Sequence, residues 1–518
     1  MFQSRRVCAV GIAFVASAVI LGSAPAVSQT VLPAEARTAR VFENARKQGP
    51  LALRAFLNRM PKGADLHVHL SGAVYAETFI REAGDDEFCV NAAQLKIDSE
   101  QHAPNCPAGE SAAKDVPSNQ HLYDALIDAF SMRTFVPVTG ESGHDHFFDT
   151  FDRFGDDKRF TGEWIDEVVS RAAAQNEQYM ELMQTPGFRP AAALGYKFGW
   201  NGDPAQLREK LLAEPTFRAN IESDRAELAG ALKKRDDLEH CGQADAAPGC
   251  KVTVRFLYQV LRGFPPEQVF AQTLLGFEVA STDSDVVGIN FVMPEDGYIS
   301  MRDYALQMRM LDYLHGQYPK VHITLHAGEL GEDMVPPEGL RFHIRMAVEQ
   351  GHAERIGHGV DVMFEDHPWE LMKEMADRHV MVEANLTSND VILNVKGADH
   401  PFMLYRKAGV PVALSTDDEG VSRIDLTHEY VRAADTYPLS YHDLKLMVRA
   451  GIEHSFLPGA SLWEHVTPEK LESPVTACRG QLGAESPAGA CATLVHGSGK
   501  AQQQWELERR FHAFESSF

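Results

Sequence analysis

The sequence has no long basic run and, beyond residue 21, no long apolar run. It has 49 Lys and Arg against 73 Asp and Glu, a formal net charge of −24. Nucleic acids and anionic membranes are bound by clustered Lys and Arg, so we expect neither as the main partner. A small neutral or cationic substrate suits such a surface better than a highly phosphorylated one. Internal repeats and low-complexity tracts are also absent, which excludes solenoid and fibrous classes.

The uncharged apolar run that is present lies at the N-terminus. Arg5 and Arg6 precede the run 7–21, and two small-x-small cleavage sites follow within 24–28. We expect residues 1–28 to be a signal peptide and the mature protein to be secreted or periplasmic, with no membrane contact after cleavage. Loss of the two arginines changes the net charge from −24 to −26. The alternative is an uncleaved anchor, for which the run is short.

The seven cysteines include no C-x-x-C spacing, which disfavours a structural zinc site. Cys8 lies in the predicted signal peptide, and the other six could pair in fifteen ways. Local pairing is the simplest interpretation, because each close pair lies within one irregular stretch and an oxidising compartment preserves disulfides. It would join Cys89 to Cys106, Cys241 to Cys250, and Cys478 to Cys491.

Eight short apolar or β-branched runs alternate with segments of helical periodicity. Such alternation indicates βαβ units in a parallel sheet, and eight units over roughly 400 residues predict an α/β fold, the TIM (β/α)8 barrel, with insertions. The runs are 64–70, 179–183, 252–260, 286–292, 321–326, 355–358, 379–383 and 410–415. Helical periodicity is found in 34–57, 266–280, 301–315, 340–350, 369–378 and 502–514.

This pattern also predicts the domain organisation. A helical extension precedes the barrel, a Gly/Ala/Ser-rich extension follows it, and two cysteine-bearing insertions interrupt it. The expected ranges are 1–28 for the signal peptide, 29–60 for the N-terminal extension, 61–465 for the barrel, 85–120 and 198–251 for the insertions, and 466–518 for the C-terminal extension.

Two histidines one residue apart, His67 and His69, lie in the first predicted strand. Alternate residues of a strand point the same way, so both side chains can reach one metal ion. The pattern is weak alone, because with 22 histidines in 518 residues about one such pair is expected by chance. A second pair, His144 and His146, precedes an aromatic, helix-like stretch, and we interpret it as structural or adjacent to the substrate.

Three further clusters lie where later predicted strands end. His326 ends the fifth run and Glu329 follows it, His358 ends the sixth, and Asp417 and Asp418 end the eighth. Each has a structural alternative: a core histidine, a helix N-terminal acid or a helix cap. Together they fall at the C-terminal ends of strands of one barrel, where such folds keep their active sites. The sequence therefore predicts a metal-dependent active site there.

The combined motifs resemble those of the adenosine deaminase family of metal-dependent hydrolases. Their order and spacing match the family from about Met60 to Pro458. The export signal and the cysteine-bearing insertions are similar to the secreted, growth-factor-related branch, or to a bacterial periplasmic relative. The motifs are the H-x-H after Met60-Pro61-Lys62, His-Ala-Gly-Glu at 326–329, Gly-His-Gly at 357–359, Thr-Ser-Asn at 387–389 and Ser-Thr-Asp-Asp at 415–418.

The resemblance implies one zinc ion per chain, held by His67, His69, His326 and Asp417, with water at the open position. Nitrogen and carboxylate ligands in an incomplete shell are typical of catalytic zinc, and zinc lowers the pKa of bound water to about 7.

The resemblance also implies the catalytic roles of three further residues. His358 would hold the hydroxide and stabilise charge that develops during attack. Glu329 would protonate purine N1 as hydroxide adds to C6, and Asp418 would share a proton at N7 and help orient the water.

Several departures from the family pattern lie around substrate recognition, whereas every implied metal and proton-transfer residue is present. They are Ser71, before Gly72, in place of the acid that contacts the ribose 5′-hydroxyl; Met293 in place of the glycine that donates near purine N3; Asn385-Leu386 in place of Cys-Pro; and Glu419 in place of the proline after Asp-Asp. The reaction class is therefore better supported than the substrate.

We predict hydrolytic deamination of adenosine or deoxyadenosine to inosine or deoxyinosine and ammonia. One alternative is a zinc hydrolase acting on another aminopurine, a modified adenine nucleoside or an amide, which Ser71 and Met293 motivate. The other is an extracellular binding or signalling protein with a vestigial site, which export and the insertions motivate. The sequence leaves open whether the chain forms a homodimer.

Overall fold

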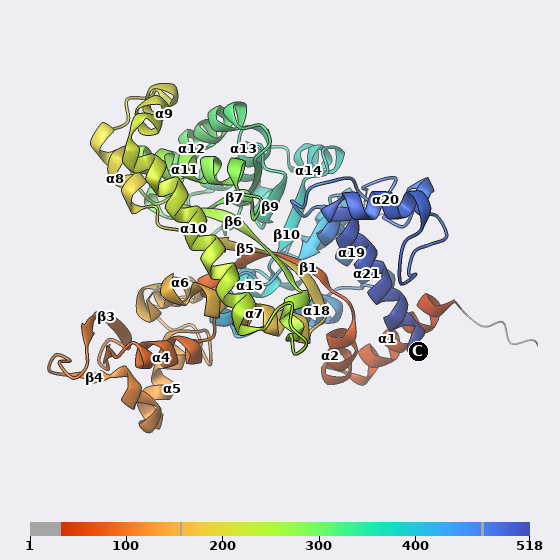
Figure 1. Ribbon diagram of the computed structural model, residues 1–518, viewed down its shortest axis with the longest axis horizontal. Helices are drawn as coiled ribbons and strands as arrows, with labels where there is room; N and C mark the ends of the chain where they lie inside the picture. The colour runs from red at the N-terminus through yellow and green to blue at the C-terminus, as the bar shows by residue number, and fades with distance from the viewer. Residues whose placement is uncertain (1–32, 156–157, 468–470) are drawn as a thin grey trace, which may run out of the picture.

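The centre of the computed structural model is an eight-stranded parallel sheet in the order β1-β5-β6-β7-β8-β9-β10-β11 (Figure 1). The structure describes residues 33–155, 158–467 and 471–518, so the predicted signal peptide and Cys8 lie outside the described residues. The strands are β1 Gly63–His69, β5 Glu177–Gln184, β6 Thr253–Leu261, β7 Val286–Val292, β8 His322–Ala327, β9 Arg355–His358, β10 Met381–Ala384 and β11 Val412–Leu414.

Helices surround the barrel and connect its strands. Several of them begin with proline in the first turn, where its missing N–H and fixed φ favour helix initiation. In the first half of the chain they are α1 Ala34–Gln48, α2 Pro50–Arg59, α3 Leu70–Ala73, α4 Ala76–Asp85, α5 Gln120–Ala129, α6 Gly143–Phe154, α7 Thr161–Ala174, α8 Arg189–Phe198, α9 Pro204–Ala213 and α10 Pro215–Leu238. In the second half they are α11 Pro266–Thr282, α12 Tyr298–Gln317, α13 His343–Glu349, α14 Pro368–Asp377, α15 Leu386–Leu393, α16 Phe402–Ala408, α17 Glu419–Ser422, α18 Leu426–Thr436, α19 Tyr441–Glu453, α20 Gly489–Gly497 and α21 Gly499–Ser516.

The sheet closes where β1 meets the end of β11. Val68 and Asp417 form a parallel bridge, and the Asp417 N–H donates to the carbonyl of His67 over 2.8 Å. All residues of β1 and β5 are buried, as expected for parallel strands that are covered on both faces. The predicted TIM barrel is confirmed.

The eight predicted runs all overlap barrel strands, but two predicted helices were wrong in detail. The helix expected over 34–57 is broken at Gly49, whose φ of 104° favours glycine, and Pro50 starts a new helix. The helix expected over 340–350 is a 3₁₀ turn, Pro337–Leu340, followed by α13. The predicted C-terminal helix is α21.

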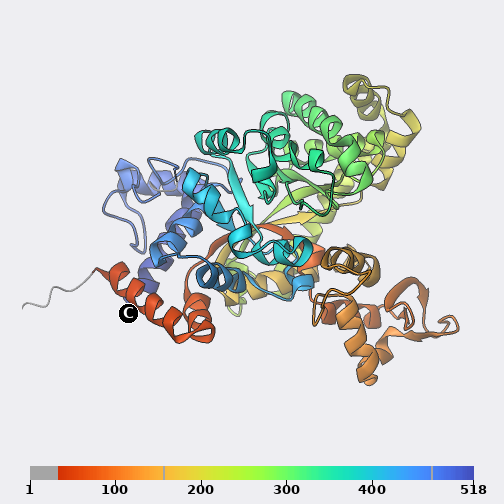
Figure 2. The same ribbon diagram turned by 180° about the vertical axis from the view of Figure 1, so that it is seen from behind.

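Two segments project from the barrel in both views (Figures 1 and 2). The first carries a three-stranded antiparallel sheet of β2 Phe88–Asn91, β3 Lys96–His102 and β4 Glu110–Ala112, in the order β3-β2-β4, beside α4 and α5. The second contains α8, α9 and part of α10. The structure has the three local disulfides expected from the sequence, Cys89–Cys106, Cys241–Cys250 and Cys478–Cys491.

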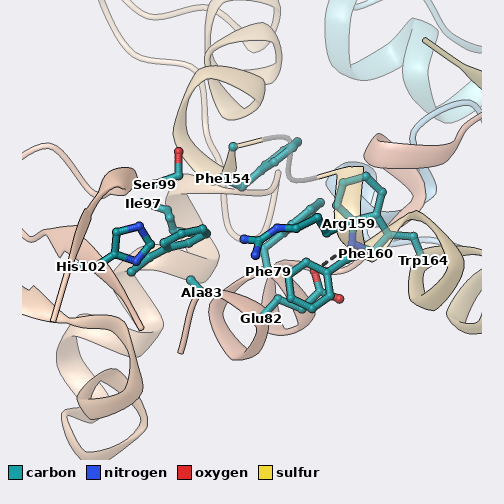
Figure 3. Close-up of a pocket in the computed structure, with 12 residues that line it drawn as sticks. Phe79, Glu82, Ala83, Ile97, Ser99, His102, Phe154, Arg159, Phe160 and Trp164 are labelled. Carbon is teal, nitrogen blue, oxygen red and sulfur yellow. Dashed lines mark hydrogen bonds between the residues drawn. The ribbon is translucent and has the colours of Figure 1, made fainter. Parts of the chain in front are cut away.

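A hollow of about 360 Å³ lies beside the inserted sheet and is lined largely by aromatic rings (Figure 3). At its wall the indole N–H of Trp164 donates to Glu82 over 2.8 Å, and burial raises the pKa of Glu82 to about 7. None of the predicted site residues lines this hollow, so it is separate from the predicted chemistry.

The two ends of the described chain pack together. Helix α1 contacts α21, and the Arg37 Nε donates to the Phe518 carbonyl over 3.0 Å. The expected domain boundaries remain predictions. Within the described ranges, no helix has both the length and the hydropathy that a membrane span requires.

Lys62, in the Met-Pro-Lys motif, joins the end of α2 to the base of the barrel. Its side chain is fully buried, and its ammonium donates to the carbonyls of Leu57 (2.7 Å), Met60 (3.2 Å) and Gln175 (2.6 Å). We expect Lys62→Met to lower the free energy of unfolding by about 3 kcal/mol, because buried carbonyls would lose their donor. Urea denaturation measures this, with the exposed Lys47→Met as control. Equal unfolding curves for the two variants would contradict the assignment.

Candidate active site

Four predicted ligands converge at the C-terminal mouth of the barrel. His67 and His69 come from β1, His326 from β8, and Asp417 follows β11; all are buried, and their ligand atoms lie within 4.8 Å of one another. The His326 Nε2 is 3.1 Å from the Nε2 of His67 and 3.1 Å from that of His69. One Asp417 oxygen lies 3.4 Å and 3.2 Å from the same two nitrogens. The barrel thus brings together residues up to 350 positions apart in the chain, since β1 and β11 are neighbours.

The second nitrogen of each of these histidines faces a hydrogen-bond acceptor. The pairs are His67 Nδ1 with Glu383 at 2.6 Å, His69 Nδ1 with the Gln259 side-chain carbonyl at 2.7 Å, and His326 Nδ1 with the Asn290 side-chain carbonyl at 2.8 Å. Each Nδ1 therefore donates its proton, which leaves the Nε2 atoms as acceptors. Acceptors of this kind orient the imidazoles of metal sites and set their tautomers.

The resulting donor set fits a divalent cation. Three Nε2 lone pairs and a carboxylate face one another in a buried space, and one Asp417 oxygen has no hydrogen-bond partner among the described residues. Without a cation these groups repel each other and remain unsatisfied. Nitrogen and oxygen donors in this number suit Zn²⁺.

The sequence did not identify the three acceptors, although each is a polar residue inside an apolar strand run. Glu383 belongs to a fully buried network in which Arg355 donates to Glu383 (2.5 Å) and to Glu181 (2.6 Å). Burial alone would raise the pKa of Glu383, but Arg355 and His67 outweigh it and hold the pKa below its usual value. Glu383 is therefore an anionic acceptor for His67.

His358, at the end of β9, is oriented by a chain of hydrogen bonds from the loop before α16. The Phe402 N–H donates to His400 Nδ1 (3.1 Å), His400 Nε2 donates to the Asn389 carbonyl (3.0 Å), and the Asn389 amide donates to His358 Nδ1 (2.9 Å). His358 Nε2 therefore carries the proton and faces Asp417 at 3.9 Å. Burial lowers the pKa of His358 to about 3, so it acts as a neutral donor. The asparagine of the Thr-Ser-Asn motif, Asn389, is thus the residue that orients His358.

Glu329 follows β8, and hydrogen bonds from its main chain to Glu295 hold it in place. The N–H groups of Gly328 (3.0 Å) and Glu329 (2.8 Å) donate to the two carboxylate oxygens of Glu295, and His343 donates to the same carboxylate (2.5 Å). No helix follows Glu329, which excludes the helix N-terminal role. Burial and the charges of Asp417 and Glu295 raise its pKa. Among the described residues one of its oxygens has no hydrogen-bond partner, although it lies 3.4 Å from His358 Nδ1. This carboxyl is suited to carry a proton.

Asp418 approaches the backbone of α3 closely. A Cβ atom at Gly72 would lie 1.5 Å from one Asp418 oxygen, so glycine is required there. Burial raises the pKa of Asp418 to about 7, with His69 opposing the shift. Although Asp418 precedes α17, its side chain makes no capping bond, which excludes the helix-cap alternative. Gly72 supports the site through Asp418 and does not line the pocket.

A cavity of about 390 Å³ opens above these residues. Its apolar wall includes Phe147, Phe148 and Phe151 of α6, and its polar wall includes Ser71, Glu329, Asp417 and Asp418. Pockets of this size, mainly apolar with a few polar groups, are typical of small-molecule sites.

Met293 lies where the family pattern has glycine, and its backbone keeps a conformation that favours glycine, with φ of 95°. Its side chain lines the cavity, and its sulfur accepts the Gly263 N–H over 3.3 Å.

The second H-x-H pair lies in the first turn of α6. His144 contacts Asp296 at 3.1 Å, and His146 contacts Glu141 at 3.0 Å. Neither lines the cavity, although the aromatic residues that follow them do. The two histidines therefore make contacts within the fold, and they lie next to the residues that line the pocket.

The fold and the site together define a (β/α)8 barrel with a buried three-histidine, one-aspartate centre at the C-terminal ends of its strands. Residues 233–464 match the model of the adenosine deaminase family. This range contains His326, Glu329, His358, Asp417 and Asp418, whereas His67 and His69 precede it and join the site only through folding.

Curated relatives match a shorter stretch. The adenosine deaminases of Escherichia coli strains SMS-3-5 / SECEC and O7:K1 are each 37% identical over 137 residues, which is 26% of this chain and 38% of theirs. The chain therefore spans less than half the length of the curated relatives that it matches.

Solved structures resemble the fold over most of the chain. A zinc-containing amidohydrolase from Burkhoderia ambifaria has a TM-score of 0.50 at 18% identity, covering 78% of this chain and 88% of its own. Arabidopsis ADAL complexed with IMP has a TM-score of 0.50 at 22% identity over 77% and 93%. The N6-methyl-AMP deaminase of Arabidopsis thaliana has a TM-score of 0.50 at 22% identity over 78% and 94%. These likenesses support the barrel fold.

Proposed function

We propose that this chain is a zinc-dependent aminohydrolase of the adenosine deaminase family that converts adenosine or deoxyadenosine to inosine or deoxyinosine and ammonia. One observation carries the proposal. Two buried carboxyls, Glu329 and Asp418, line a small-molecule cavity beside the histidine–aspartate centre, and each has an oxygen that no other residue in the described part of the chain hydrogen-bonds.

The four convergent residues His67, His69, His326 and Asp417 would hold the zinc ion. When bound there, zinc supplies Lewis-acid activation of a water molecule at neutral pH. Glu383, Gln259 and Asn290 set the tautomers of the three histidines, so that each Nε2 atom has a free lone pair to coordinate the zinc ion.

The chain's own residues then handle the protons. Glu329, protonated because burial raises its pKa, donates to purine N1, which makes C6 electrophilic. The neutral His358 keeps its Nε2 proton and offers it as a hydrogen bond to the attacking oxygen, and Asp418 holds N7. As the C6–O bond forms and the C6–N6 bond breaks, one proton of the attacking water passes to N6, which leaves as ammonia. The other water proton replaces the one that Glu329 gave to N1. General acid–base help of this kind contributes about 10² to 10⁴ in rate.

The charge of the cavity favours a nucleoside over a nucleotide. No Lys or Arg is among the described residues that line it, and the lining includes the carboxylates of Asp152, Glu329, Asp417 and Asp418. We expect kcat/KM for adenosine to exceed that for AMP by at least about 100-fold, because a phosphate there would meet acidic side chains and no Lys or Arg. Ammonia release by zinc-loaded protein measures both. Equal values for the two substrates would contradict the nucleoside assignment.

A second candidate substrate is another aminopurine or a modified adenine nucleoside. Ser71 and Met293 favour it, since both line the cavity where the family pattern has an acid and a glycine. A panel of N6-substituted adenosines, adenine and guanosine distinguishes the two. If the protein converted a member of this panel but not adenosine, the proposed substrate would be wrong and the proposed reaction class would still hold.

We further propose that the mature protein is exported, to the periplasm or the exterior. The predicted signal peptide and the three disulfides support this. Mass spectrometry of the secreted chain tests it, and a cytoplasmic chain with an intact N-terminus would contradict it.

A further inference from the structure

A second cavity of about 530 Å³ lies at the opposite end of the barrel, among the loops that enter β8, β9 and β10. We call it the basal cavity. The strands run from this end to the catalytic mouth, so the two cavities lie on opposite faces. The basal cavity is unusual in its side chains, because five histidines line it in a chain of net charge −24. They are His315, His322, His352, His379 and His454.

The acidic groups of the basal cavity already have partners. Glu354 accepts from His322 at 2.8 Å, and Glu453 accepts from Ser461 at 2.6 Å and from Gln504 at 2.5 Å. These carboxylates are the acids that line it.

Lys500 lies at the edge of the cavity without a matching anion. Its ammonium donates to the Glu453 backbone carbonyl over 2.7 Å, and none of the ion pairs of the described residues includes it. Burial lowers the pKa of Lys500, although the carboxylates of Glu453, Glu181 and Glu354 oppose the shift, so these acids do not offset the cost of burying the cation. A bound anion would supply a closer counter-charge.

Two histidines have unused hydrogen-bonding capacity there. His379 Nδ1 is buried with no hydrogen-bond partner among the described residues, and its backbone is held at φ 57°, a strained conformation for this residue. His454 donates from Nδ1 to the Ala450 carbonyl (2.9 Å), which leaves Nε2 to gain a proton.

Phe456 and Arg355 lie between the basal cavity and the catalytic centre. The ring of Phe456 stacks on His322, with centroids 4.7 Å apart, and lies 3.8 Å from the Arg355 guanidinium. Arg355 is neutralised by Glu181 and Glu383. The remaining cation, Arg378, is paired with Glu374 at 2.8 Å.

A metal ion does not explain this arrangement. Among the described residues, no three ligand atoms from the basal cavity lie within 4.8 Å of one another, unlike those of the catalytic centre. We propose that the basal cavity binds a phosphate-sized oxyanion, with Lys500 as its cation and His379 and His454 as its hydrogen-bond donors. The ligand is either free phosphate or the phosphoryl group of a small metabolite.

Binding should take up a proton. Burial, with smaller contributions from the neighbouring Lys500 and Arg355, lowers the pKa of His454 to about 3, so this imidazole is neutral in the unliganded protein at pH 7. An anion at Nε2 raises that pKa, and the carboxylates of Glu354 and Glu453 act in the same direction. Affinity should therefore rise as pH falls, by up to about tenfold per pH unit for one linked proton.

Calorimetric titration of the zinc-loaded protein at constant ionic strength tests the proposal. We expect saturable binding of inorganic phosphate and of sulfate, weakened about 10- to 100-fold in Lys500→Met, as for loss of a charge-assisted bond. Lys500→Arg should retain binding, and Lys320→Met, an exposed neighbour outside the cavity, should match the unchanged protein. Sulfate, whose charge is constant between pH 6 and 8, reports the pH dependence, which His454→Gln should flatten.

Ribose 5-phosphate distinguishes the two sources. Binding more than about tenfold tighter than that of phosphate assigns the site to a phosphorylated metabolite, and equal binding assigns it to free phosphate. The proposal is overturned if the folded protein binds neither anion, or if folded Lys500→Met, checked by circular dichroism, binds both as tightly as the unchanged protein. It does not depend on the proposed deaminase activity.

Discussion

Glu329→Gln is expected to lower kcat for adenosine deamination by about 10³-fold, within the range for loss of a general acid. Glutamine keeps the size of the side chain and one acceptor oxygen but cannot deliver a proton to purine N1. The backbone clamp from Glu295 to Gly328 and Glu329 uses main-chain N–H groups, so the substituted loop should keep its position. Steady-state kinetics by ammonia release, with zinc content measured on the same sample, tests this.

Glu332→Gln is the matched control, because Glu332 lies three residues further along the same loop and is exposed. It should retain full activity. An active Glu329→Gln variant with full zinc occupancy would remove Glu329 from the chemistry. If, in addition, the unchanged protein bound no metal, the extracellular binding or signalling alternative would replace the enzyme.

Removal of a single imidazole from the centre should abolish both metal binding and activity. In His326→Ala we expect zinc affinity to fall by more than about 100-fold, since loss of an outer-shell partner alone costs 10- to 100-fold. His326 is central because its Nε2 lies 3.1 Å from those of both His67 and His69. Metal analysis after dialysis against a weak chelator measures the loss.

The second H-x-H pair provides the control for this experiment. His144→Ala should keep one zinc ion per chain, because His144 contacts Asp296 and does not reach the centre. Zinc should also raise the melting temperature of the unchanged protein, since binding to the folded state alone adds about 4 kcal/mol at a thousandfold excess over Kd. Retention of zinc by His326→Ala, or its loss from His144→Ala, would contradict the ligand set.

The sequence predicted the barrel because its strands and helices have different periodicities. The eight runs are short and largely apolar or β-branched, and they are separated by segments long enough for helices, several of which have helical periodicity. Such local patterns depend only on neighbouring residues, so they can be recognised without knowledge of the fold. The same holds for the local disulfides, since Cys241 and Cys250 are nine residues apart.

The residues that orient the site could not be recognised from local patterns. Glu383, Gln259 and Asn290 are polar residues within largely apolar strands, and the sequence offered no reason to pair any of them with a particular histidine. The route from His400 through Asn389 to His358 also joins separate elements. Only closure of the barrel decides these pairs, because the alignment of parallel strands sets which side chains meet.

By itself the sequence determined the succession of strands and helices, the class of chemistry suggested by its histidines and carboxylates, and the positions that depart from the family pattern. The tertiary structure decided which of two H-x-H pairs reaches the centre, which proton each imidazole carries, and that a cavity lined by five histidines lies at the far end of the barrel. The reason is physical: hydrogen bonds and electrostatic interactions act over a few ångströms in space, whereas the partners lie up to hundreds of residues apart in the chain.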